Sequence, residues 1–215
     1  MAMQQRQQNV QTLKIMKNLK LQTLLFCFII FSIISCKAKT LPLNTHLDNI
    51  PNNAYVKDLN NELSAYIETC EANFDNKKIT LYFTKQENKL EERVKKNFYR
   101  DVIIVKYVIK TTSGTVLQDT KNNNITMNEL YSIGTRPSNN ELYLSYSGTN
   151  CMVGWGMVIL KKLNANQLAW NYRPNSIIID DNTCPPGTDL TIYLPEVKDL
   201  IFTKVSPTGG GFVRE

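Results

Sequence analysis

The chain has 215 residues, of which 42% are hydrophobic and 20% charged, enough for one domain with a substantial core. Its formal net charge is +6, but four of the 25 Lys and Arg residues precede Cys36, while all 19 acidic residues follow it. The chain from Cys36 onward is therefore close to neutral, and the sequence pI of about 9.0 is no argument for a nucleic-acid partner.

Residues 1–35 are predicted to be a signal peptide. An apolar run from Leu24 to Ile34 follows a segment that is basic and has no acidic residue. The run is too short for a bilayer-spanning helix, which needs roughly 20 apolar residues, but it has the length of a signal-peptide core. Met16 is an alternative start, because the segment that begins there already has signal-peptide proportions.

The end of this run predicts a lipid anchor. Ile33-Ile34-Ser35-Cys36 resembles the lipobox of bacterial lipoproteins, in which the cysteine carries the lipid and becomes the first residue of the mature chain. The alternatives are secretion without lipid and an uncleaved signal anchor. No acidic run follows Cys36, unlike in surface-exported lipoproteins, so this resemblance implies the periplasmic face of the outer membrane.

Residues 36–55 contain Pro42 and Pro51 and no sustained apolar period, and we predict a lipidated tether there. A single β domain is expected over residues 56–205. The glycine-rich residues 206–215 are expected to form a flexible tail.

Alternating apolar and polar residues predict strands along most of the domain. A turn at residues 112–115 is expected to form a hairpin, and a segment rich in Lys and Glu, 86–98, is the one helical candidate. We therefore predict a mainly β fold, an antiparallel barrel or sandwich of about eight strands with at most one or two short helices. The expected strands span residues 78–85, 101–110, 115–119, 141–147, 151–163, 166–172, 189–194 and 200–205.

Two neighbouring strands carry the tryptophans. Large residues stand at every second position, so one strand should share a face among Val153, Trp155, Met157 and Ile159. The next should share one among Leu168, Trp170 and Tyr172. We expect Trp155 and Trp170 to be buried on the same side of one sheet.

The stretches IPNNAYVKDLNNELSAY, KKITLYFTKQ, TSGTVLQDT and DDNTCP, with the closing LP and FTK, resemble a family of flavobacterial (Bacteroidota) lipoproteins that share a domain of unknown function. The resemblance covers about residues 36–204 and implies a location and a β architecture, with no activity attached. Members often carry Gly-Thr-Trp after a tyrosine that corresponds to Tyr66, similar to the opening of lipocalin-like barrels. Here those positions read Glu68-Thr69-Cys70.

Three cysteines remain in the domain, Cys70, Cys151 and Cys184, and they allow three single pairings in an oxidising compartment. The family resemblance includes two cysteines in positions like those of Cys151 and Cys184, which also flank the tryptophan hairpin, and it implies that these two are bridged. Cys70 is then expected to be a small buried hydrophobe.

No catalytic residue, metal site or cofactor is predicted. The only histidine, His46, lies in the expected tether, so triads that need a histidine base have none in the domain. Asp180 and Asp181 suggest calcium as an alternative to a solvated loop.

These observations predict a non-enzymatic lipoprotein of the cell envelope, bound to the membrane through Cys36 and acting as a structural or interaction module on an envelope protein partner. The first alternative is a lipocalin-like carrier of a small apolar or lipidic ligand. The second is an envelope hydrolase. The residues that would line a carrier's pocket, or else fill the core, are Phe83, Tyr107, Trp155, Trp170 and Tyr172.

Overall fold

The computed structural model describes residues 38–122 and 129–205. The predicted signal peptide, Cys36 and the predicted tail lie outside these residues. The residues from Lys39 onward form one compact unit.

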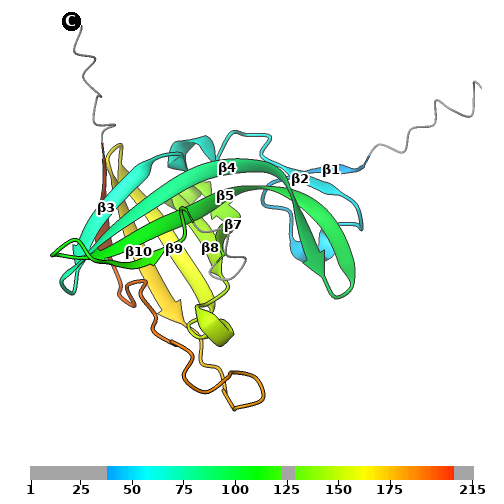
Figure 1. Cartoon of the computed structure of the whole chain (residues 1–215). Helices are drawn as coiled ribbons and strands as arrows, with labels where there is room; N and C mark the ends of the chain where they lie inside the picture. The colour runs from blue at the N-terminus through cyan, green and yellow to red at the C-terminus, as the bar shows by residue number, and fades with distance from the viewer. Residues whose placement is uncertain (1–37, 123–128, 206–215) are drawn as a thin grey trace, which may run out of the picture. The chain divides into compact units, whose positions relative to one another are not determined.

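Eight antiparallel strands form a closed barrel, which confirms the predicted fold class (Figure 1). Around the barrel the order is β5-β4-β3-β11-β10-β9-β8-β7, and the pairing of Ile104 with Tyr131 closes β7 onto β5. Closure leaves the barrel itself without sheet edges. The eight strands are β3 (Thr69–Phe74), β4 (Lys77–Arg93), β5 (Lys96–Thr111), β7 (Leu130–Arg136), β8 (Glu141–Tyr146), β9 (Gly156–Asn164), β10 (Gln167–Pro174) and β11 (Leu200–Lys204).

The predicted helix over residues 86–98 is wrong, because this segment forms the end of β4, a tight turn and the start of β5. Arg93 pairs with Lys96 across the turn, and Glu91 pairs with Phe98. Lys and Glu favour a helix in isolation, but most residues of this segment are paired in the β4–β5 ladder, the rest of which belongs to the barrel wall. Tertiary pairing therefore overrides the local preference.

The predicted tether is also corrected, because residues 39–57 fold onto the hairpin. β1 (Thr40–Pro42) and β2 (Tyr55–Lys57) add to β5 as parallel strands. Between them, the short 3-10 helix η1 (Leu47–Asn49) leads into a small buried cluster of Ile50, Ala54, Val56 and Phe98. The apolar residues that form this cluster are spaced irregularly in the sequence, so no period revealed them.

The rest of the chain covers the barrel's ends and sides. The 3-10 helix η2 (Ser64–Tyr66) brings Tyr66 and Leu63 into the main core. The turn at residues 112–115 leads into β6 (Val116–Asp119), as predicted, and β6 pairs with β5. Two further 3-10 helices are η3 (Pro137–Asn139) and η4 (Asn150–Met152). Residues 189–194, predicted to be a strand, are irregular.

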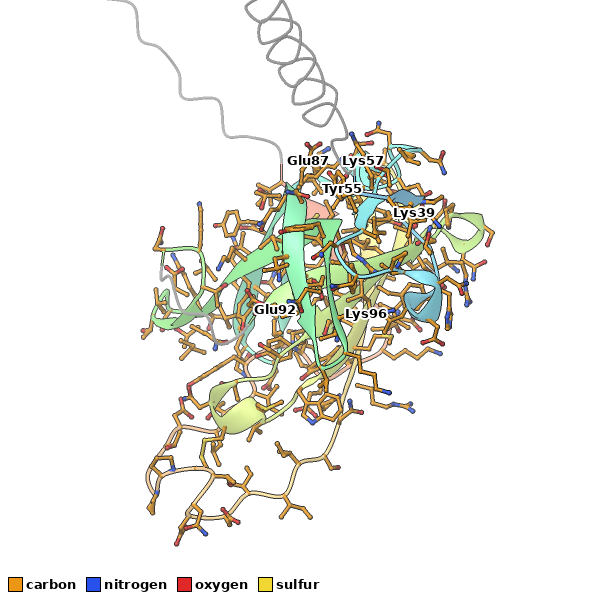
Figure 2. The ribbon with its side chains drawn as sticks, turned by 90° about the vertical axis from the view of Figure 1, so that its right-hand side faces the viewer. Lys39, Tyr55, Lys57, Glu87, Glu92 and Lys96 are labelled. Atoms are coloured by element: carbon orange, nitrogen blue, oxygen red, sulfur yellow. A yellow bond between two sulfur atoms is a disulfide. The ribbon has the colours of Figure 1, made fainter. Side chains whose placement is uncertain are left out.

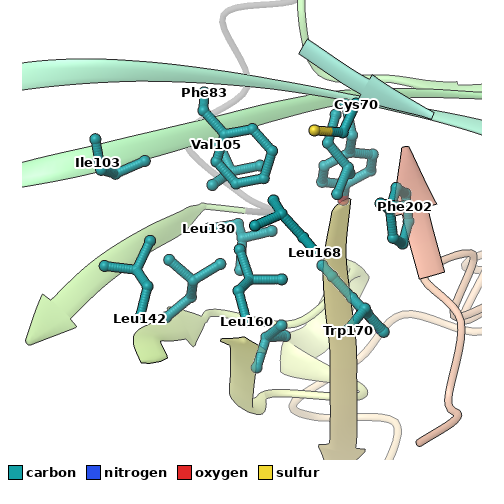
Figure 3. Packing of buried hydrophobic residues seen from close by; sticks show 14 of the residues in the cluster. Cys70, Phe83, Ile103, Val105, Leu130, Leu142, Leu160, Leu168, Trp170 and Phe202 are labelled. Atoms are coloured by element: carbon teal, nitrogen blue, oxygen red, sulfur yellow. The ribbon is translucent and has the colours of Figure 1, made fainter. Parts of the chain in front are cut away.

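The core lies inside the barrel, between the inward faces of its strands (Figure 3). Leu160 pairs with Trp170 and Val158 with Tyr172 across β9 and β10, and all four are buried. Leu142 and Leu144 of β8 continue this layer on the other side of β9. Along β8 buried and partly exposed side chains alternate, as the pleat requires.

Candidate functional site

Four of the five residues predicted to line a pocket or fill the core belong to the core. Phe83, Tyr107, Trp170 and Tyr172 are all buried in the barrel interior. Trp170 meets Tyr172 edge-on, with ring centroids 6.2 Å apart, and lies 5.7 Å from Phe202. Figure 3 shows Phe83, Trp170 and Phe202 pointing into the same interior. These aromatic side chains fill space within the barrel.

The polar atoms of these aromatic residues are satisfied inside the protein. The Trp170 Nε1–H donates to the Pro195 carbonyl at 2.9 Å, and the Tyr172 hydroxyl donates to the Gly154 carbonyl. The Tyr107 and Tyr146 hydroxyls lie 3.4 Å apart, and burial raises the pKa of both phenols. Neutral, paired phenols of this kind are elements of a rigid core rather than acid–base groups.

The predicted burial of Trp155 is wrong: its side chain is 40% exposed, whereas that of Trp170 is fully buried. Trp155 follows Gly154, which has a φ of +75° and faces inward. A Cβ atom on Gly154 would lie 2.8 Å from Ile192 and 2.9 Å from the Tyr172 hydroxyl. Ile192 and the Tyr172 hydroxyl thus fill the space on the inner side of Gly154, and the side chain of the next residue, Trp155, points outward.

The disulfide Cys151–Cys184 is present, with Cα atoms 5.6 Å apart. It joins η4, in which Cys151 has a φ of +56°, to the irregular segment between β10 and β11. Cys70 is free and buried in the core. Burial, followed by the Glu68 carboxylate, raises the pKa of its thiol to about 12, so the reactive thiolate does not form at neutral pH.

The outer face of β9 is apolar as well as its inner face. Met157 and Ile159 continue the outward direction of Trp155, and Met157 is 45% exposed. Their inward neighbours Val158 and Leu160 are fully buried. The outward side chains of β9 therefore form an apolar surface that is not part of the barrel core.

An open hollow of about 620 Å³ lies over this apolar face, and we name it the outer groove. Its floor is formed by β9 and β10, with Met157 and Ile159 beside Asn171 and Arg173. One wall is the segment before β11, which includes Val197, Lys198 and Asp199. Glu141 and Lys161, which are paired across β8 and β9, also line the groove.

The wall of the outer groove is held in place by backbone contacts. The Asp199 N–H donates to Asn171 Oδ1 at 3.0 Å, and the Tyr172 N–H donates to the Val197 carbonyl at 3.2 Å. The Lys198 and Asp199 side chains lie 3.8 Å apart at the exposed rim. The floor is apolar along β9 and polar along β10, and charged groups of both signs surround it. This arrangement is suited to an apolar segment with polar ends, and it lacks the single dominant charge that an anionic or cationic ligand would need.

The outer groove was not predicted. The one sign of it in the sequence is the run Met157-Val158-Ile159-Leu160, which is apolar on both faces of a strand. The wall contributed by residues 197–199 could not be expected, because it depends on where an irregular segment returns to the barrel.

The other predicted groups are not gathered into a site. Of the described residues, no helix is long and apolar enough to cross a bilayer. Within the same ranges, no group of three or more His, Cys, Asp and Glu side chains is placed to share a metal ion. Asp180 instead accepts hydrogen bonds from the N–H groups of Asn182 and Thr183, at 3.0 and 2.8 Å, in a surface turn.

Comparisons with known proteins add no identification. No family model matches the chain, no curated protein matches its sequence, and no solved structure matches its fold.

Proposed function

We propose that this chain is a lipoprotein of the bacterial cell envelope that acts as a non-enzymatic interaction module. The lipid anchor is placed on Cys36, at the periplasmic face of the outer membrane. Support comes from the apolar run that ends at Ser35-Cys36 and from the resemblance to flavobacterial lipoproteins. A disulfide in the domain agrees with an oxidising compartment.

The observation that carries the interaction role is the outward apolar row formed by Met157 and Ile159 on the floor of the outer groove and by the exposed Trp155 just before β9. The barrel interior is filled by its own side chains, so the apolar surface available to another molecule lies outside. Exposed apolar residues with a polar rim are typical of protein contact sites. The occupant that fits is an apolar segment of an envelope protein.

The first alternative, a carrier of a small apolar ligand, would need space among the inward residues. Phe83, Tyr107, Trp170 and Tyr172 take up that space with one another and with Phe202. This favours the interaction module over the carrier. Binding of an apolar fluorescent probe that is competed by lipid and lost in a Tyr107→Trp variant would reverse the preference.

A site-specific photo-crosslinker tests the outer groove in cells. At position 157 it should give one defined adduct with an envelope protein, because Met157 forms part of the floor. At position 116 it should give none, although Val116 on β6 is similarly exposed, at 51%. The position-157 adduct should also disappear when Ile159→Asp is added. Equal adducts at both positions, or none at 157, would contradict the groove as the contact site.

The anchor is tested separately by mass spectrometry of membrane-extracted protein. An acylated N-terminus at Cys36 is the expected result. An unmodified protein in the soluble periplasmic fraction would overturn the lipoprotein assignment and leave the crosslinking result to judge the groove.

A further inference from the structure

The β4–β5 hairpin extends beyond the barrel, and this extension forms neither the barrel core nor the outer groove. β3 pairs with β4 only as far as Tyr82, and β7 meets β5 at Ile104. From there to the turn at residues 94–95, β2 is the one strand among the described residues that pairs with the hairpin. We call residues 86–100 of this hairpin, together with β1 and β2, the arm; Figure 1 shows it curving away from the remaining strands.

The arm is fixed rather than free to swing. A bulge between Gln86 and Lys89 bends it, with Asn88 at a φ of +57°. The fully buried Asp101 carboxylate accepts the Asn88 N–H at 3.1 Å and the Asp58 N–H at 3.0 Å, and it also accepts the Tyr55 hydroxyl. One carboxylate thereby joins β2, the bulge and β5.

One face of the arm is turned to solvent and is partly apolar. Glu91 pairs with Phe98 on the face covered by the Ile50 and Ala54 cluster, so Leu90 and its partner Tyr99 lie on the opposite face. Leu90 is 43% exposed. At the turn, Val94 is fully exposed beside Lys95, which forms no ion pair among the described residues.

The chain enters the arm at the same end. β1, β2 and β5 run parallel, with Thr40 beside Tyr55 and Tyr55 beside Tyr99, and all three strands lead away from the turn. Lys39 therefore lies at the end of β1 that is nearer the turn. Figure 2 labels Lys39 beside Tyr55 of β2, together with Glu92 and Lys96, which flank the turn. Cys36 is three residues before Lys39, a reach of about 11 Å at full extension. From Tyr99 to the turn is roughly 15 Å along the strand.

We propose that the arm is a second membrane contact, with Leu90, Val94 and Tyr99 entering the interface of the leaflet that holds the lipid anchor. This inference rests on the proposed lipidation of Cys36. With so short a connection, the anchor brings this end of the domain to the membrane surface. Aliphatic and tyrosine side chains next to a lysine suit the boundary between acyl chains and headgroup phosphates. The exposed acids Glu87 and Glu92 lie on the arm too, so apolar insertion contributes more than charge.

Depth-sensitive labelling of the lipidated full chain in phosphatidylethanolamine and phosphatidylglycerol vesicles tests the arm. An environment-sensitive fluorophore on Val94→Cys should shift to shorter wavelength and be quenched by lipid-borne quenchers. The same label on Val116→Cys should do neither, because β6 pairs near the opposite end of β5. Both positions are exposed, and Cys70 is buried, so labelling is selective. A lipidated, vesicle-bound protein whose position-94 label remains in water would overturn the arm contact and leave the anchor intact.

Vesicle sedimentation with charge and apolar variants gives a second readout. Lys95→Glu should weaken retention on these vesicles by at least about fivefold at low salt, as for loss of one interfacial cation. Val94→Asp should weaken it on vesicles of phosphatidylcholine as well, because it removes the apolar contact. If mass spectrometry finds no lipid on Cys36, the proposed anchor fails and sedimentation still decides the arm. Residual binding that Val94→Asp abolishes would support it, and no binding, or binding unchanged by Val94→Asp, would overturn it.

Discussion

The two tryptophans differ in burial although they are close to the same pair of strands: Trp170 on β10 is fully buried, whereas Trp155, one residue before the neighbouring strand β9, is 40% exposed. On β10, Leu168, Trp170 and Tyr172 point inward and are buried. Trp155 lies one residue before β9, and Met157 and Ile159 of β9 continue the outward row, while Val158 and Leu160 face the core. The large side chains of β10 thus pack in the core, whereas those of Met157 and Ile159 on β9 lie on the outer surface of the barrel wall.

This difference follows from what stands between the large residues. In β10 the residues on the other face are Ala169, Asn171 and Arg173, and the last two are polar, so only one face of this strand carries large apolar side chains. In β9 the intervening residues are also apolar, and either face satisfies the pattern. Period two identifies residues that share a face, but the inward face is selected by neighbouring strands, here by Leu142 and Leu144 of β8.

The largest expected effect is the difference between the two tryptophans in how much each contributes to the free energy of unfolding. Trp170→Ala should lower the free energy of unfolding by about 3–5 kcal/mol, because it leaves a cavity among Tyr172 and Phe202 and removes the hydrogen bond to Pro195. Trp155→Ala should lower it by at most about 1 kcal/mol, because the side chain is already partly in water. Chemical denaturation of both variants measures the difference. Equal losses would mean that Trp155 is packed as Trp170 is.

How much of this fold could be predicted depends on whether local pattern and tertiary pairing agree. They agree from Asp101 to Lys110 and from Leu168 to Tyr172, where alternation matches the barrel wall, so the strands and the fold class could be predicted. They conflict from Gln86 to Phe98, where helix-favouring charged residues are held in a hairpin. Residues 39–55 have no period at all, because Ile50 and Ala54 pack from an irregular segment.

The next effect concerns the turn that leads into the outward strand. Cys151→Ser should lower the free energy of unfolding by about 3–4 kcal/mol, since the bridge closes a loop with a sequence separation of 33 residues. The matched variant Cys70→Ala removes a buried thiol without breaking a crosslink and should cost only about 1 kcal/mol. Thermal melting under non-reducing conditions compares them. A larger loss for Cys70→Ala would show that the bridge contributes little.

A smaller effect is the loss of stability at alkaline pH that follows from burying the phenol of Tyr66. Burial raises the pKa of Tyr66 from 10.0 to about 12, so the folded state resists ionisation that the unfolded chain undergoes freely. A raised pKa on an acid stabilises the fold below the unfolded value, and that stability is lost as the pH rises. We expect the free energy of unfolding to fall by on the order of 2 kcal/mol from this group between pH 10 and 12.

Tyr66→Phe separates this contribution from the other buried phenols. It removes the ionisable hydroxyl and should flatten the alkaline slope of stability while leaving the value at neutral pH nearly unchanged. Denaturant midpoints at neutral and alkaline pH give the comparison. An unaltered slope in Tyr66→Phe would mean that Tyr66 ionises equally well in the folded state.

The candidate site was less predictable than the fold, for a physical reason. Cys151 and Cys184 could be paired through the family resemblance, and Trp170 through its strand. The outer groove needs three things at once: the outward choice of β9, the return of Val197 along β10, and the hydrogen bond between Asp199 and Asn171. None of these is local in sequence, and the last two depend on an irregular segment.

The smallest expected effect concerns the exposure of the two tryptophans to solvent, which can be measured without any change in stability. Iodide should quench the fluorescence of Trp155 in the folded protein and leave that of Trp170 largely unquenched, because one side chain is 40% exposed and the other is fully buried. Trp155→Phe and Trp170→Phe isolate each signal, and the first should be stable to within about 0.5 kcal/mol of the wild type. If Trp155 were protected from iodide in the isolated protein, a neighbouring segment would have to cover the outward row. If it were quenched in the isolated protein and protected when the proposed envelope partner is added, the same row would be the surface that this partner covers.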